Sequence, residues 1–224
     1  MSATFEQWLR ASFDHPPPET MKEKDWYWDD GFDSFWEPLC ITDALAVRYM
    51  TRLFREPKYL TVYSLEQVAE GIWFLIGGSS PSDSSRALLS SAVSLRTRVA
   101  CISAMTEFFR SFIAPATPGL AYEEADSFHC ACFMWWHILA VSPTHGETLE
   151  GEHELHDACL RAMSEILGLP SDVCRISALH GLNHWQEHYG ERVEATIDAF
   201  LAHGQEITPR IREYATNARA GLCL

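Results

Sequence analysis

The sequence feature that most constrains the fold is a succession of helical stretches and short turns in residues 169–221. Helices joined by short turns pack against one another, because each has to bury its apolar face. Glycines end two of these stretches, at Gly190 and Gly221. The pattern predicts stacked helical hairpins, and apolar residues recur at helical spacing in three runs: residues 171–189, 191–203 and 206–220.

The rest of the chain also favours helices. Ser64 and Gln67 are spaced as a capping box, and three consecutive prolines end the first helix. Strand evidence is limited to one short run, residues 59–63. Further helices are predicted over residues 4–13, 42–55, 65–76, 86–95, 98–113, 122–141 and 153–167. We therefore predict an all-α fold in a single domain, residues 1–224, divided into an aromatic and acidic segment (1–38), a helical part (39–113) and helical repeats (120–221).

The chain is strongly acidic. Its formal net charge is −14 and its isoelectric point is near 5.0. Such a surface repels nucleic acid and anionic membranes and attracts a basic partner protein. Three arginines, Arg86, Arg96 and Arg98, are too few to reverse that balance. We therefore expect no nucleic acid and no membrane among the partners, and a basic protein instead.

Cysteine usage and the ends of the chain indicate a reducing compartment. Seven cysteines are scattered without a tight framework, which predicts reduced and mostly buried thiols. Cys130 and Cys132 fall in a very apolar stretch and are predicted to be buried and inert. The first residues lack the pattern of a signal peptide, and no apolar run is long enough to span a bilayer. We expect a cytoplasmic protein.

The most distinctive local composition is an aromatic and acidic stretch. Between residues 14 and 37 there are eight acidic residues and two lysines. Tryptophan anchors interfaces, and neighbouring carboxylates can pair with the lysines and arginines of a partner. Alternatively, the rings close the open end of a helical stack, with the carboxylates outward. The candidate partner-binding residues here are Asp25, Trp26, Trp28, Asp29, Asp30, Asp33 and Trp36.

A second candidate surface is a row of histidines. His180, His184 and His188 are spaced four residues apart and share one helix face, with Glu187 beside them. Two such histidines could share a zinc ion. The three cannot converge on one ion, because a straight helix rises about 12 Å over this span. We predict that they line a groove and bind a partner, and we predict no metal site.

An enzymatic alternative remains open. His156 and Asp157 have the order of the HD dyad of metal-dependent phosphohydrolases, and His129, His137 and His180 could supply further ligands. The chain lacks the nucleophile-elbow, phosphate-loop and dinucleotide-binding motifs, so we assign no catalytic residue and no cofactor.

The C-terminal part resembles HEAT-type helical repeats. Residues 211–218 read IREYATNA, similar to the V-R-x-x-A-x-x-A helix opening of that family, and residues 176–182 read ISALHGL, similar to its x-x-A-L-x-x-L helix. The resemblance covers about a quarter of the chain. It implies an α-α superhelix with a concave recognition surface. Small acidic bacterial proteins of this kind are often immunity proteins, which neutralise a toxin.

The function we expect is therefore binding of a basic protein without catalysis, in the form of an immunity protein that occludes a bacterial toxin. Two alternatives remain: an α-helical metal-dependent hydrolase that uses a histidine and aspartate cluster, and a structural subunit of a homo-oligomer.

Overall fold

The computed structural model describes residues 2–16, 25–29, 31–118, 126–145, 151–202 and 207–222. The protein is all-α, as predicted, and the described residues contain no strand beyond one isolated bridge, between Gly77 and Leu139. The helices are α1 (Phe5–Phe13), α2 (Phe32–Trp36), α3 (Asp43–Arg55), α4 (Leu65–Ile76), α5 (Leu95–Phe108), α6 (Ala114–Ala116), α7 (Ser127–Ile138), α8 (Glu152–Leu167), α9 (Asp172–Ala202) and α10 (Pro209–Arg219).

Most helices begin at a hydroxyl or carboxylate cap that accepts a hydrogen bond from a backbone amide of the first turn. The capping box at Ser64 and Gln67 is present as predicted, and Thr4 and Gln7 form a second one. Single caps are Thr42, Ser94, Asp126, Ser171 and Thr208. These local bonds set where the helices start, and therefore which faces they bury.

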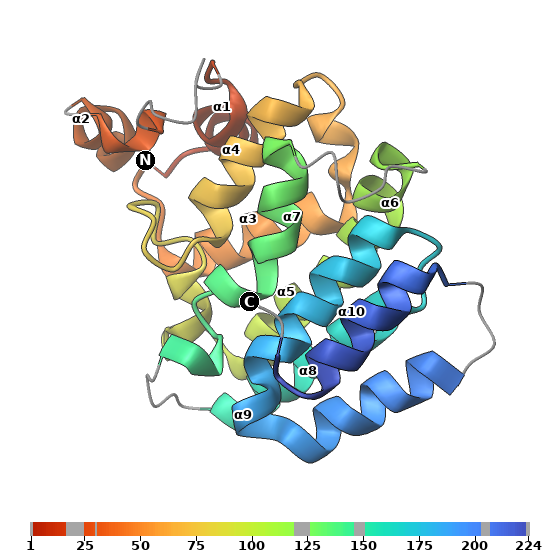
Figure 1. The fold of residues 1–224 in the computed structure, drawn as a ribbon. Coiled ribbons are helices and arrows are strands. Elements are labelled where there is room, and N and C mark those ends of the chain that lie inside the picture. The colour runs from red at the N-terminus through yellow and green to blue at the C-terminus, as the bar shows by residue number, and fades with distance from the viewer. Residues whose placement is uncertain are drawn as a thin grey trace.

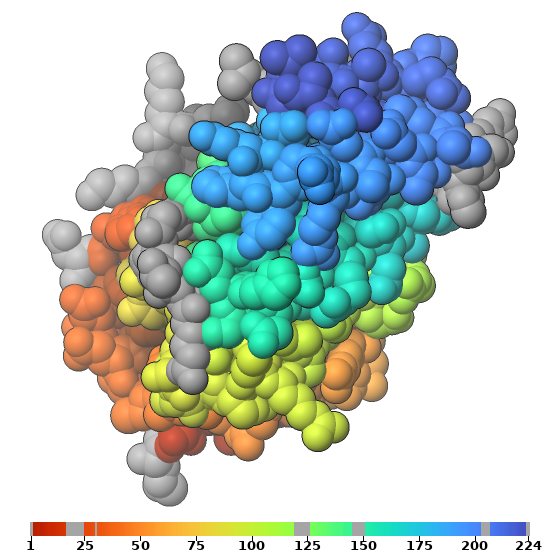
Figure 2. Space-filling view, turned by 90° about the horizontal axis from the view of Figure 1, so that it is seen from below, coloured from red at the N-terminus to blue at the C-terminus, as the bar shows by residue number. Residues whose placement is uncertain are grey.

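The helices are arranged from one end of the molecule to the other in roughly their order in the sequence. In Figure 1, α1 and α2 lie at one end, and α8, α9 and α10 lie at the other. The colours in Figure 2 likewise run from orange through yellow and green to blue across the face that it shows. Helix α7 packs between α4 and α9, while α5 packs between α3 and α8. Helices α9 and α10 pack on each other as consecutive elements.

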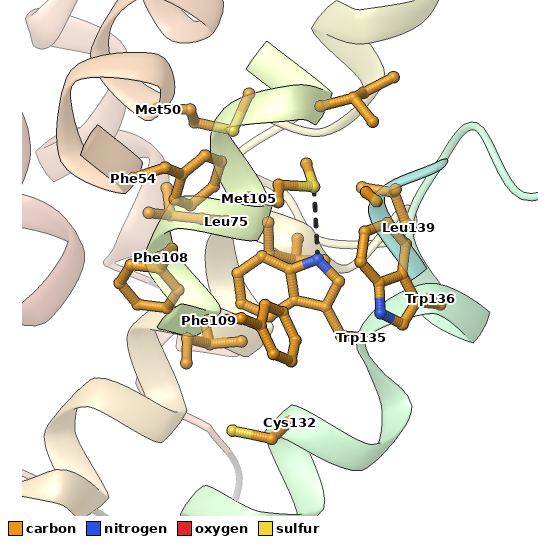
Figure 3. Packing of buried hydrophobic residues seen from close by; sticks show 14 of the residues in the cluster. Met50, Phe54, Leu75, Met105, Phe108, Phe109, Cys132, Trp135, Trp136 and Leu139 are labelled. Carbon is orange, nitrogen blue, oxygen red and sulfur yellow. Dashed lines mark hydrogen bonds between the residues drawn. The ribbon is translucent and has the colours of Figure 1, made fainter. Parts of the chain in front are cut away.

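Helix α7 supplies the centre of the core. Trp135 and Trp136 are fully buried, as the apolar composition of this stretch predicts. Trp135 lies beside Phe108 and Phe109, and its Nε1 donates to the Met105 sulfur at 3.4 Å (Figure 3). Truncating a buried tryptophan of this kind costs about 3–5 kcal/mol.

Close approach of α7 and α9 depends on a glycine. A Cβ at Gly181 would lie 2.5 Å from the Trp136 Cβ and 2.7 Å from the Met163 sulfur. Nearby, Ser177 of α9 donates a hydrogen bond to the backbone carbonyl of Cys132 on α7. Small residues on this face of α9 therefore bring the two helices, and the histidines they carry, close together.

The secondary structure differs from the sequence analysis in three places. Residues 59–63 are not a strand, because Pro57–Leu60 forms a 3-10 helix followed by a turn. Only Arg86–Leu89 of the predicted helix at 86–95 is helical, as a 3-10 turn. The serines that follow it form local side-chain bonds, such as that from the Ala92 amide to Ser90, and these compete with a helix.

The third difference is the turn predicted at Gly190. Helix α9 instead continues through a kink at Tyr189, whose φ of −133° and ψ of 31° are not helical. A glycine without a proline costs a helix only about 1 kcal/mol, so the chain resumes the helix after one irregular residue.

Some of the described cysteines are buried and others are exposed. Cys101, Cys132, Cys159 and Cys174 are buried, and burial raises the pKa of each thiol. The prediction for Cys130 was wrong: its side chain is exposed, because it lies on the face of α7 opposite the core. Cys40 is also exposed.

Candidate functional site

The aromatic and acidic segment is anchored by Phe74, a buried residue of α4. The segment forms a 3-10 turn, Trp26–Trp28, and the short helix α2. Four of its rings surround Phe74, with centroid distances of 4.7 Å for Trp26, 5.3 Å for Tyr27, 5.8 Å for Phe32 and 4.8 Å for Trp36. The His15 ring stacks on Trp26 at 3.5 Å. The segment is therefore fixed to the body of the protein by its rings.

Two rings of this segment point outward instead. Trp28 is 48% exposed and Phe35 is 43% exposed. The other large apolar side chains that are exposed in the described part of the chain are Val62 and Leu222. Exposed tryptophan and phenylalanine on an anchored segment are suited to contact another molecule, because they lose little conformational freedom on binding.

Acidic residues neighbour the two exposed rings in the sequence. Asp29, Asp33 and Glu37 are exposed, and Asp25 is half-buried. Asp30, the remaining predicted contact here, lies outside the described residues. The segment thus has its carboxylates outward and most of its rings inward, with Trp28 and Phe35 as the outward exceptions.

A cavity of about 280 Å³ opens beside the segment. Tyr27 and Trp28 form one wall, and Trp73 and His137 contribute from α4 and α7. Residues 77–80 close another side, where the Gly78 amide donates to the carbonyl of Ile138 at 2.8 Å. Hydrogen bonds of 2.6 Å from the Ser80 and Ser82 hydroxyls to the Phe74 carbonyl brace this loop. Residues 77–80 therefore form one wall of the cavity and are held in place by these hydrogen bonds.

A buried carboxyl lies beneath the same segment. Glu70 of α4 is 7% exposed, and its pKa is raised to about 7, first by burial and then by the charge of Asp25 and a hydrogen bond with it. Burial, with the neighbouring charges of Asp25 and Glu70, also raises the pKa of the Tyr27 hydroxyl. The Glu70 carboxyl is therefore partly protonated near neutral pH.

Three histidines meet between α7 and α9. The ring centres of His137 and His184 lie 4.0 Å apart with the ring planes tilted by 36°, and Nε2 of His184 lies 3.1 Å from Nε2 of His180. The other nitrogen of His180, Nδ1, lies 3.1 Å from the Tyr214 hydroxyl of α10. The Phe133 ring stacks on the His180 ring, with a centroid distance of 3.7 Å. The contacts form a chain from the cavity wall at His137 to α10.

Two histidines of the cluster, His180 and His184, have lowered pKa values. The pKa of His180 is lowered to about 3, chiefly by burial and then by His184 and His137. Burial, and after it His137, also lowers the pKa of His184. A nitrogen-to-nitrogen contact between two imidazoles needs one N–H donor and one lone pair, which the neutral rings supply.

The predicted histidine row does not form one exposed stripe. His180 is 3% exposed and His184 is half-buried, whereas Glu187 and His188 are exposed. A partner that approaches α9 from outside meets Glu187 and His188 first. Contact with His180 stays a prediction, and it requires the packing of α9 against Phe133 and Tyr214 to open.

The residues of the predicted HD dyad bind separate partners. Nδ1 of His156 lies 2.6 Å from the Tyr189 hydroxyl, and burial lowers the pKa of His156. Asp157 bonds to Arg192, which lowers the pKa of the carboxyl. His129, a suggested further ligand, lies 2.7 Å from Asp126. Within the described ranges, no group of three or more histidines, cysteines and acids is placed to hold a metal ion.

Sequence reasoning missed Glu70, Trp73 and the role of His137. Glu70 and Phe74 are four residues apart in α4 and so share one face, and a lone acid on an otherwise apolar helix face is a readable signal. Trp73 and His137 come from elements far apart in the chain. Their meeting at the cavity depends on how α4 packs against α7, which a sequence pattern does not specify.

Comparisons of the chain with protein-family models, with curated proteins and with solved structures found no match. In the part of the chain that the structure describes, no helix has the length and apolar character needed to cross a membrane.

Proposed function

We propose that this protein binds a basic partner protein, without catalysis, through the aromatic and acidic segment at residues 25–37. The observation that carries the proposal is the outward orientation of Trp28 and Phe35 on a segment whose other rings are held around Phe74. Tryptophan and other aromatic side chains commonly anchor protein interfaces, and here two exposed rings are carried by a segment that is already fixed in place.

The charge of the segment selects the kind of partner. Asp29, Asp33 and Glu37 are exposed next to the two rings, and the whole chain carries a net charge of −14. Lysine and arginine side chains pair with carboxylates and also bind over aromatic faces. The cavity beside Trp28 is lined by Tyr27 and Trp73, so it offers ring faces to a cationic side chain of the partner.

The finer form of the proposal is an immunity protein that covers a basic bacterial toxin. Its support is the HEAT-like resemblance of residues 171–221, together with helices α8, α9 and α10, which pack one on the next. The thiols are free in all six described cysteines, in keeping with the cytoplasm, where such a partner would be held. Co-expression with the product of a neighbouring gene tests this form, and relief of its toxicity supports it.

Fluorescence anisotropy with a labelled peptide tests the binding site directly. The probe is an arginine- and lysine-rich peptide, and its uncharged counterpart has citrulline and norleucine in place of those residues. We expect the basic peptide alone to bind, with an affinity that falls several-fold as salt rises from about 0.05 M to about 0.5 M.

Matched variants locate the interaction. Trp28→Ala and the Asp29→Asn, Asp33→Asn double variant should weaken binding about tenfold. Val62→Ala and Glu213→Gln change an exposed apolar residue and an exposed acid outside the segment, and should leave the affinity for the peptide unchanged. Equal affinity in all of these variants, or salt-independent binding, would contradict the proposal.

A further inference from the structure

A groove of about 650 Å³ lies between α3 and α5, away from the aromatic and acidic segment. Four arginines line it: Arg48, Arg52, Arg55 and Arg96. The first three are at positions i, i+4 and i+7 of α3, which places them on one helix face. Arg96 is the second residue of α5. A protein with a net charge of −14 thus gathers four of its 17 basic residues around one hollow.

These positive charges are largely uncompensated. Glu56 is the single acid among the residues that line the groove, and Lys58 lies 3.4 Å from its carboxylate. Arg48, Arg55 and Arg96 are exposed, and none of them forms an ion pair with another residue of the described ranges. Their mutual repulsion lowers stability unless an anion binds between them.

Arg52 is held in place at the groove. Its Nη2 donates to the Tyr59 hydroxyl at 2.7 Å, and its guanidinium lies 4.0 Å from the centre of the Phe5 ring. Glu6 approaches it at 3.8 Å. The side chain is therefore oriented before any ligand arrives, which reduces the entropy lost on binding.

The first turn of α5 adds to the positive potential. Thr97 lines the groove, and its hydroxyl lies 2.7 Å from that of Ser94, the residue that caps the helix. The amino-terminal end of a helix carries a partial positive charge and favours anions. The groove therefore combines four guanidinium groups with the positive end of a helix of 14 residues.

We propose that this groove binds a small molecule that carries two or more adjacent phosphate groups. Guanidinium groups bind phosphate oxygens in pairs, so several arginines suit several phosphates. The volume is in the range of sites that hold nucleotide-sized ligands, and Ala44 and Ala100 give it an apolar part. A long nucleic acid is disfavoured, because it would extend beyond the groove onto an acidic surface.

Calorimetric titration of the full chain tests the proposal with three probes: tripolyphosphate, ATP and a single-stranded oligonucleotide. We expect tripolyphosphate and ATP to bind and to raise the melting temperature. Tighter binding of ATP would show that the groove also holds the nucleoside, and equal binding would show that the phosphates suffice. No binding of either at millimolar concentration, or binding of the oligonucleotide alone, would overturn the proposal.

Arginine substitutions test whether the ligand binds in the groove. Arg55→Ala and Arg96→Ala should each weaken tripolyphosphate binding at least about fivefold, and Arg55→Lys should weaken it less. Arg212→Ala, which removes an exposed arginine of α10, should change it less than about twofold. Equal loss in Arg212→Ala would show nonspecific attraction and refute the site. All of these side chains are exposed, and melting of each unliganded variant verifies that its fold is intact.

Discussion

Replacing Glu70 with glutamine should stabilise the protein at neutral and higher pH. Glu70 is buried under the aromatic and acidic segment beside Asp25, and its pKa is raised from 4.5 to about 7. Between these two pH values the folded protein holds a proton that the unfolded chain has released. The free energy of unfolding therefore falls as pH rises from about 4.5 to about 7, and stays low above that.

The size of the effect follows from the shift. One pKa unit corresponds to about 1.4 kcal/mol, so a rise from 4.5 to about 7 amounts to about 3 kcal/mol at pH 8. Glutamine keeps the shape of the side chain, carries no charge and can donate a hydrogen bond to Asp25. For a chain of 224 residues, a gain of about 3 kcal/mol raises the melting temperature by roughly 6–12 °C.

Urea and thermal unfolding at pH 5 and pH 8 measure this. Glu70→Gln should gain most at pH 8 and little at pH 5. Glu66→Gln is the matched control, because Glu66 is exposed one turn earlier in α4, where its charge favours the helix start. That control should lose a few tenths of a kcal/mol at both pH values. An equal gain for Glu70→Gln at pH 5 and pH 8, or no gain at all, would refute the reasoning.

Three further predictions concern the rings, the helix packing and the thiols. Trp36→Ala should lower the free energy of unfolding by about 3–5 kcal/mol in urea titrations, because Trp36 is buried. Trp28→Ala should change it by less than about 1 kcal/mol, and similar losses in the two variants would contradict the assigned orientations. Gly181→Ala should cost about 1–3 kcal/mol through its clash with Trp136, while Gly190→Ala, with no atom closer than 3.5 Å, should be tolerated in the same assay. A maleimide reagent should label Cys40 and Cys130 of the native protein within minutes and leave Cys132 unlabelled until the protein unfolds. Mass spectrometry of the cysteine peptides follows the labelling, and early labelling of Cys132 would refute its burial.

Much of the helical pattern could be predicted from local chemistry. The helix starts at Thr42, Ser64 and Ser171 depend on side chains within one turn of the amides they cap, so a short window of sequence contains the whole signal. The predicted helix at 86–95 was wrong, and the strand-like run at 59–63 was misleading, because local side-chain bonds and a proline compete with regular structure there.

The candidate sites could be predicted only in part. The composition of residues 25–37 marked the segment, but the outward orientation of Trp28 and Phe35 depends on how the other rings pack around Phe74. The arginine groove needs α5 to bring Arg96 beside α3, although the i, i+4, i+7 spacing of Arg48, Arg52 and Arg55 was a readable signal. Contacts between distant elements set both sites.

The most direct test of partner binding at the aromatic and acidic segment is the indole N–H spectrum of the protein labelled with ¹⁵N-tryptophan. The chain has eight tryptophans, and Trp28→Phe and Trp8→Phe identify the two signals of interest. Addition of the basic peptide should shift the exposed Trp28 signal and leave that of Trp8, which is fully buried in α1, in place. Saturable peptide binding with an unmoved Trp28 signal would contradict the account.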